Sequence, residues 1–164
     1  MNNADVDMLL NQCRTELDHV VTTISGAGGA ISPVTPYLTK YAVIRACGSI
    51  EVSFKSLIAD FCTKQSNAQI KRYIHMRIIK GSANPSEKNI VNILNQFDEA
   101  WRKRFQSNLR SDPNKRQLIY SLQSLVDARN EFAHGGNPTL TIADVVRHFD
   151  HARRVVEHVD AVIV

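Results

Sequence analysis

Apolar residues recur along most of this chain every three or four positions, the spacing that gathers them on one face of an α-helix. The first such stretch covers residues 4–24. A second helix should begin at Thr35-Pro36, where a capping residue precedes proline, and should continue to about residue 63. The capping-box spacing from Ser66 to Gln69 predicts a third helix that ends near residue 80. No stretch shows the two-residue alternation of a strand, so the pattern predicts an all-α protein.

Three more helices are expected in the second half of the chain. One carries apolar residues at 90, 93, 94, 97, 101 and 105, one runs from Asp112-Pro113 to His134-Gly135, and the last is capped by Thr141. About six helices with short connections predict a compact, mostly antiparallel bundle. We expect one domain over residues 1–164, in which an N-terminal helix and a Gly-rich linker (1–33) lead into the core bundle (34–164).

The composition is that of an ordinary globular protein, with 43% hydrophobic and 22% charged residues. The cysteines, Cys13, Cys47 and Cys62, are odd in number and form no close pair, which fits a reducing compartment better than a disulfide framework. The polar, acidic N-terminus is unlike a signal peptide, and no apolar run is long enough for a membrane span. We therefore expect a soluble, cytoplasmic protein with no membrane partner.

Positive charge is concentrated in the middle of the sequence. The net charge is only +4, but residues 71–116 hold eleven Lys/Arg against four Asp/Glu. A polyanion is the natural partner of such a segment, although a solvated face that keeps the protein soluble would look the same. The strongest RNA-binding candidates are Arg102, Lys103, Arg104, Lys115 and Arg116.

The most informative chemistry lies at the end of the fifth predicted helix. Its apolar stripe runs Leu118, Leu122, Leu125, and the next position on that stripe is Arg129, followed by Phe132. A guanidinium on an apolar stripe needs a partner, because its desolvation is costly. The partner is either a carboxylate in a buried ion pair, or water and phosphate in a cleft or subunit interface. The pattern leaves both open.

His134 follows Arg129 by five residues, about 140° around an ideal helix. Arginine matches phosphate oxygens with a planar fork of donors, and histidine exchanges a proton near pH 7. The pair therefore suits the binding or cleavage of a phosphodiester, although His134 could also be a helix-terminal residue without chemistry. Asn130, one turn before His134, could orient the imidazole or hold a phosphate oxygen.

The run from Leu125 to Gly135, with Arg129-Asn130 at its centre and His134 at its end, resembles the signature of the HEPN family. The branch that it resembles is called RiboL-PSP-HEPN. Residues 42–51 are similar to the long helix of that branch, which often carries an acidic residue where this chain has Glu51. The resemblance extends from Pro36 to Val159, and the helix that follows Thr141 agrees with it.

This resemblance implies a small helical bundle, commonly a homodimer, with arginine and histidine facing a cleft at the dimer interface. It implies a metal-independent endoribonuclease without cofactor, in which the RNA 2′-hydroxyl attacks the adjacent phosphorus. It also implies a toxin with an antitoxin or inhibitor protein, or a defence effector. Arg129 and His134 would be the catalytic pair. Some members only bind RNA, nucleotide or a partner protein, and this is the alternative function. A helical scaffold with Arg129 in a buried ion pair is a third hypothesis.

Two other groups of residues could contribute chemistry. Asp144, His148 and His151 share one face of the last helix, which could hold a metal, although such spacing is common on solvated helices. Arg45 and Glu51 on the second helix could pair with Arg129 or support the site, but structural roles are favoured for both.

Overall fold

The computed structural model describes residues 1–137 and 139–163, and this part of the chain is all-α. The elements are α1 (Ala4–Gly26), the short 3₁₀ turn η1 (Gly29–Ile31), α2 (Thr35–Thr63), α3 (Ala68–Ile74), the π-helical turn η2 (His75–Ile79), α4 (Glu87–Phe97), α5 (Glu99–Ser111), α6 (Lys115–Ala133) and α7 (Ile142–Asp160). The all-α bundle predicted from the sequence is therefore confirmed.

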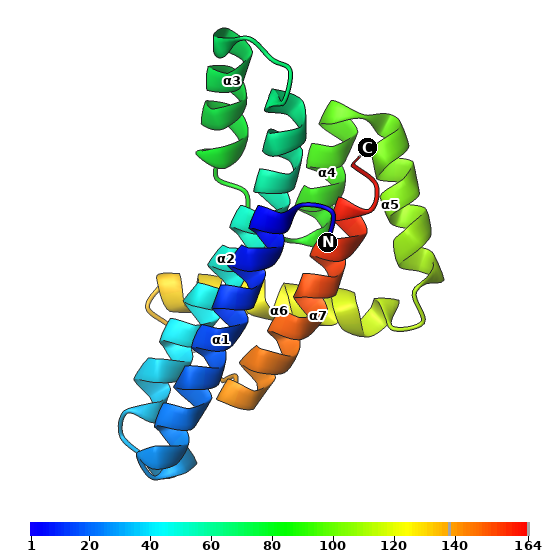
Figure 1. Ribbon diagram of the computed structural model, residues 1–164. Helices are drawn as coiled ribbons and strands as arrows, with labels where there is room; N and C mark the ends of the chain where they lie inside the picture. The colour runs from blue at the N-terminus through cyan, green and yellow to red at the C-terminus, as the bar shows by residue number, and fades with distance from the viewer. Residues whose placement is uncertain (138, 164) are drawn as a thin grey trace.

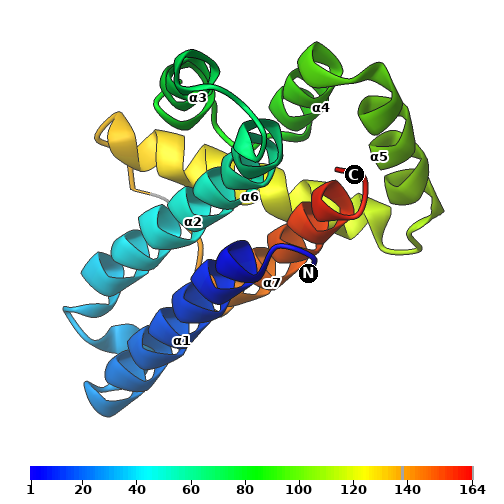
Figure 2. The same cartoon turned by 45° about the horizontal axis from the view of Figure 1, so that its top comes forward.

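Helices α1, α2 and α7 run side by side, and α6 crosses them at a steep angle (Figures 1 and 2). Helices α4 and α5 form a hairpin-like pair at one end of the molecule, while α3 stands out from the rest. The core between the layers is built from fully buried side chains that include Leu10, Leu17, Phe54, Leu122 and Phe149. This core fixes α6 against α2 and α7, which decides where the end of α6 projects.

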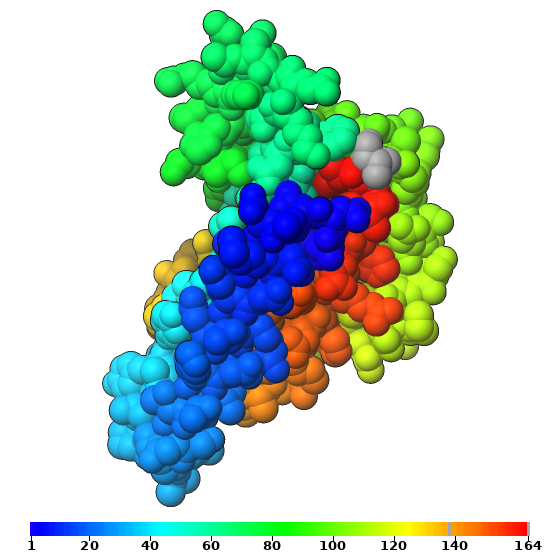
Figure 3. All heavy atoms as spheres, in the orientation of Figure 1, coloured from blue at the N-terminus to red at the C-terminus, as the bar shows by residue number. Residues whose placement is uncertain are grey.

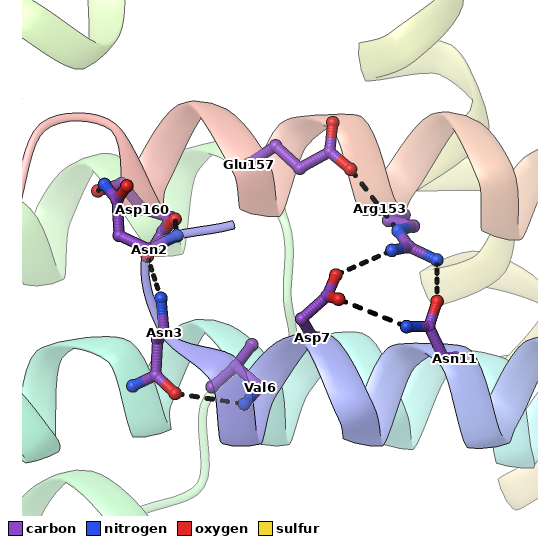
Figure 4. A network of polar contacts seen from close by, with 8 residues as sticks. All are labelled: Asn2, Asn3, Val6, Asp7, Asn11, Arg153, Glu157 and Asp160. Atoms are coloured by element: carbon purple, nitrogen blue, oxygen red, sulfur yellow. Dashed lines mark hydrogen bonds and ion pairs between the residues drawn. The ribbon is translucent and has the colours of Figure 1, made fainter.

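Polar contacts join α1 to α7 along one edge of the bundle (Figure 4). Arg153 on α7 donates to Oδ1 of Asp7 at 2.8 Å and to Oδ1 of Asn11 at 2.7 Å. Near the ends of these helices, the backbone N–H of Asn3 donates to Asp160 at 3.3 Å. Helix α1 is thus held to the bundle by polar contacts as well as by its buried apolar face.

The predicted boundaries hold for α2 and for the start of α1, but the fourth predicted helix is in fact two helices. Asp98 has extended backbone angles (φ −157°, ψ 119°), and its side chain accepts from the backbone N–H groups of Ala100 and Trp101. It therefore ends α4 and caps α5, which gives seven α-helices in the described residues instead of about six.

The third helix also begins differently from the prediction. Asn67, not Ser66, is its N-cap, because the Asn67 side chain accepts from the N–H of Ile70 at 2.9 Å. The helix then widens into η2, where the N–H of Lys80 donates to the carbonyl of His75 at 2.9 Å. By contrast, the capping box predicted at Thr141 is present, with Asp144 as its second member.

None of the helices in the described ranges combines the length and the apolar character that crossing a membrane requires. All three cysteines are free thiols.

Candidate functional site

The C-terminal end of α6 is shaped by two glycines. Gly135 has φ +84°, and its N–H donates to the carbonyl of Phe132 at 3.0 Å, while the N–H of Gly136 donates to the carbonyl of Glu131 at 2.8 Å. These two bonds form a Schellman motif, which stops the helix. A Cβ at position 136 would lie 2.6 Å from the side chain of Glu131 and 3.0 Å from its carbonyl oxygen, so a larger residue there would force Glu131 to move. His134 is consequently the last residue before the chain reverses, and its side chain is exposed.

Arg129 is exposed, and no carboxylate within residues 1–137 and 139–163 pairs with it. Its Nη1 donates to Oδ1 of Asn130 at 3.2 Å. The buried ion pair that the apolar stripe left open is therefore ruled out for the described residues. Asn130 thus accepts from Arg129 and makes no hydrogen bond to the imidazole of His134, so the structure gives no support to its expected role in orienting that ring.

The exposure of Arg129 follows from the crossing of α6 over α2. Leu118, Leu122 and Leu125 on the predicted stripe are buried, whereas Arg129 on the same stripe is not. Figures 1 and 2 both show the C-terminal end of α6 crossing α2 and continuing past it. The stripe was thus predicted correctly, but its last turn extends beyond the edge of the bundle.

Helix α2 provides the neighbours of this helix end. Cys47 on α2 is buried, and burial raises the pKa of its thiol to about 12. The positive charge of Arg129 opposes this rise, and the negative charge of Glu51 adds to it. Both charged groups therefore lie close to the thiol. Glu51 is ion-paired with Lys55, whose buried ammonium group also donates to the carbonyl of Gly81 at 2.6 Å.

On the other side of the helix end, Lys40 connects α2 with the loop after α6. Its Nζ donates to Oδ1 of Asn137 at 2.6 Å and lies 5.5 Å from the ring centre of Phe132. A largely apolar pocket of about 440 Å³ opens beside it, lined by residues that include Thr39, Val43 and Leu140. No pattern in the sequence pointed to Lys40 as part of the site, because its position there depends on how α2 and α6 cross.

Comparison with protein families finds a match to the family described as RiboL-PSP-HEPN, over residues 10–164. The chain belongs to the RiboL-PSP-HEPN family. Comparison with curated proteins found no significant match, and comparison with solved structures found none. HEPN domains are all-α, in agreement with the fold, and the exposed end of α6 is the part of this HEPN domain where the arginine and histidine predicted from the resemblance lie.

Arg45 has a role away from this helix end. Its guanidinium binds both carboxylate oxygens of Glu16 on α1, at 2.5 and 3.0 Å, and donates to Oγ of Ser49 at 2.6 Å. It is a link between α1 and α2 and makes no contact with Arg129. Glu51 remains close to the site through Cys47, although its direct partner is Lys55.

The RNA-binding candidates on α5 and α6 of this HEPN domain differ in whether they already have partners within the protein. Glu99 pairs with both Arg102 and Lys103 at 3.2 Å, and Arg104 donates to the carbonyl of Val162 at 3.0 Å. Lys115 and Arg116 make no ion pair within the described part of the chain. Part of the basic segment is therefore neutralised by its own helix.

The histidines of α7 form a hydrogen-bonded group with α6. Oγ of Ser121 lies 2.9 Å from Nδ1 of His148 and 2.8 Å from Nδ1 of His151. Asp144 is used in the capping box and in an ion pair with Arg147. No set of three metal-ligating side chains occurs in the described residues, so the structure offers no support for the metal site considered from the spacing.

Proposed function

We propose that this HEPN protein is a metal-independent endoribonuclease in which Arg129 and His134 act on the scissile phosphate. The observation that carries the proposal is the exposure of both side chains at the overhanging end of α6, with no carboxylate of the described residues neutralising Arg129. A cation that is left unpaired on an otherwise apolar stripe is suited to an anionic ligand. Family membership over residues 10–164 makes RNA the first substrate to test.

The reaction that we propose is an internal transesterification of RNA. A base removes the proton of the 2′-hydroxyl, the 2′-oxygen attacks the adjacent phosphorus, and the bond to the 5′-oxygen of the next nucleotide breaks. That oxygen takes up a proton from an acid, which leaves a 2′,3′-cyclic phosphate and a 5′-hydroxyl. Histidine suits either proton transfer near neutral pH, and the guanidinium of Arg129 would stabilise the charge that develops on the phosphoryl oxygens.

A homodimer would supply both proton-transfer groups, because each chain has a single histidine at this helix end. The surface of α2 supports such a dimer. Tyr37, Tyr41, Ile44 and Val52 form an exposed apolar stripe at helical spacing, with Gly48 between them, and their exposed fractions run from 45 to 72%. Ile44 lies one turn from Cys47, and the charge of Arg129 opposes the rise in the pKa of the Cys47 thiol, which is consistent with this part of the stripe lying near the end of α6. A second copy that covered the stripe would turn the exposed helix end into a cleft.

The test is cleavage of a labelled single-stranded RNA with EDTA present. Cleavage by the wild type that His134→Ala abolishes, with an unchanged helical circular dichroism spectrum, supports the enzyme. A control variant, His19→Ala, alters an exposed histidine of α1 and should cleave normally. Cleavage that survives in His134→Ala, or that depends on added metal, would overturn the proposed mechanism.

The second function is a non-catalytic HEPN module that binds RNA, nucleotide or a partner protein. The observation in its favour is that the backbone of His134 already serves as the helix C-cap, a role that needs no chemistry from the imidazole. RNA binding by the wild type without cyclic-phosphate products would support this module. A role as a toxin restrained by an antitoxin, or as a defence effector in the cytoplasm, belongs to the enzyme hypothesis.

A further inference from the structure

Residues 64–80, which comprise α3, η2 and the connection from α2, form a protruding arm with a one-sided charge. The arm carries five basic residues, Lys64, Lys71, Arg72, Arg77 and Lys80, and no Asp or Glu occurs anywhere from residue 61 to 86. Figure 3 shows α3 and the C-terminal end of α2 projecting together beyond the rest of the surface. All five side chains are exposed.

These charges differ from those of α5 in their ion-pair partners within the described residues. None of the five cations takes part in an ion pair, whereas Arg102 and Lys103 share Glu99. The excess positive charge noted in the middle of the sequence is thus free on the arm and partly cancelled on α5. A polyanion approaching this half of the molecule meets cations that form no ion pair in the described part of the chain, of which Lys64 and Lys71 share a pocket with Asp5, Asp60 and Asp160.

Exposed apolar and aromatic side chains lie among the cations. Tyr73 is 60% exposed and Met76 55% exposed, while only Ile74 and Ile78 in the stretch 68–80 are buried. Aromatic rings between cations can stack on unpaired bases while the cations follow the phosphates. The short α3 and the π turn spread cations and apolar groups around the arm, which differs from the separated faces of a membrane-surface helix.

The end of the arm is fastened close to the helix end of the candidate site. Gly81 closes the arm, and its carbonyl accepts from the buried ammonium group of Lys55, which is also paired with Glu51. Glu51 and Arg129 both influence the thiol of Cys47. Figures 1 and 2 show α3 on the same side of α2 as the C-terminal end of α6. A strand bound along the arm would therefore lie on the side of α2 where α6 ends.

We propose that the arm is a docking surface for single-stranded RNA, in which Lys71, Arg72 and Arg77 contact phosphates and Tyr73 stacks on a base. The proposal rests on RNA being the substrate of the site at the end of α6. It assigns substrate positioning to α3 and η2, a region separate from the arginine and histidine.

Binding is measured by fluorescence anisotropy with a labelled single-stranded oligonucleotide whose 2′-hydroxyl groups are methylated, so that it cannot be cleaved. Salt is varied between about 50 and 300 mM, the range in which release of counterions dominates. Lys71→Ala/Arg77→Ala should weaken binding at least about tenfold and reduce the salt slope by about 1.4, or roughly 0.7 for each lost phosphate contact. Tyr73→Ala should weaken binding by roughly fivefold or more.

Matched controls separate the arm from the overall charge. Lys88→Ala/Arg110→Ala removes the same charge from exposed positions on α4 and α5, and Tyr120→Ala removes an exposed tyrosine from α6. Both should bind within about threefold of the wild type, since neither loses an arm contact. Equal weakening by the arm variant and by Lys88→Ala/Arg110→Ala would overturn the proposal, as would binding to phosphatidylserine vesicles but not to the oligonucleotide.

Failure of the proposed function gives a different result. If the wild-type protein binds the oligonucleotide through the arm but cleaves no RNA, the docking-surface proposal stands and the ribonuclease proposal is rejected. If the protein cleaves RNA but its arm variants bind the oligonucleotide normally, the docking-surface proposal is rejected and the ribonuclease proposal stands.

Discussion

Arg129 donates a hydrogen bond from Nη1 to Oδ1 of Asn130 at 3.2 Å, so the residue that follows the arginine engages one end of its guanidinium. The remaining donors face solvent at the exposed end of α6, because no carboxylate of the described residues occupies them. One donor of Arg129 is therefore used within α6, and the remaining donors are available to a ligand.

Arg129→Lys keeps the charge but removes the planar fork of donors. We expect a loss of RNA cleavage of at least about 100-fold, with the free energy of unfolding within about 0.5 kcal/mol of the wild type, because the side chain is exposed. Cleavage assays and urea denaturation measure the two effects. A stability loss of about 3 kcal/mol, the scale of a broken buried ion pair, would show that Arg129 is structural after all.

Gly135→Ala tests the turn that ends α6. Position 135 has φ +84°, so a side chain there should cost about 1–2 kcal/mol of unfolding free energy and shift the backbone beside His134. The matched control is Gly48→Ala, which lies within α2 and has no atom within 4 Å of the added Cβ. That control should stabilise the protein by roughly 0.5–1 kcal/mol, so equal effects of the two substitutions in thermal melts would contradict the Schellman assignment.

Stability should fall in mildly acidic solution because of His148. Burial lowers the pKa of this imidazole, with help from Arg147 and against the opposing charge of Asp144. The unfolded chain binds the proton near pH 6.5 and the folded chain only at lower pH, so the unfolded state holds more protons as the pH falls. The contribution of His148 is therefore complete above about pH 7 and is lost from about pH 6.5 down to the folded pKa.

Urea midpoints at about pH 7.5 and 5.5 measure this loss. His148→Asn should flatten the dependence, whereas His19→Asn, at an exposed position on α1, should leave it unchanged. An undiminished pH dependence in His148→Asn would assign the effect to other groups.

Asp112 fastens the corner between α5 and α6 to α7. Its carboxylate accepts from Arg154 at 2.8 Å and from His158 at 2.9 Å. Burial alone would raise the pKa of Asp112, but these contacts and the backbone N–H of Asn114 hold it below the ordinary value. Its contribution to stability is thus present above about pH 4 and is lost as the pH falls further.

Asp112→Asn should lower the free energy of unfolding at pH 7 by about 1–3 kcal/mol, the cost of leaving buried polar groups poorly matched. Asp127→Asn changes an exposed aspartate of α6 and should stay within about 0.5 kcal/mol of the wild type. Chemical denaturation measures the free energy of unfolding of both variants. Similar losses in the two would contradict the structural role of Asp112.

Most of the fold could be predicted from the sequence because the local signals for helix starts and ends agreed with the tertiary packing. Proline after Thr35 and the box at Thr141 mark helix starts, and both helices begin there. Asp98 was missed since an aspartate within an apolar pattern looks like a solvated side chain, whereas here its side chain caps the following helix. The exact start of α3 was missed because Ser66 and Asn67 are both good caps, and only the backbone decides between them.

The candidate site was predictable only in part. The spacing of Arg129 and His134 lies within one helix end and can be read locally, but the exposure of Arg129 depends on how far α6 extends past α2. The same holds for Lys40, which reaches the site from another helix. The basic segment was visible in the sequence as an excess of Lys and Arg. Which of these cations are ion-paired was not visible, because it depends on the position of Glu99 beside Arg102 and Lys103.

The hydroxyl of Ser121 lies between two imidazole nitrogens, and it has one hydrogen to donate. When both rings are neutral, one Nδ1 must therefore carry a hydrogen while the other presents its lone pair. His148 and His151 accordingly adopt opposite tautomers, and exchanging them requires protons to move on both rings. Nitrogen-15 spectra of labelled histidines would show this asymmetry as two distinct Nδ1 signals.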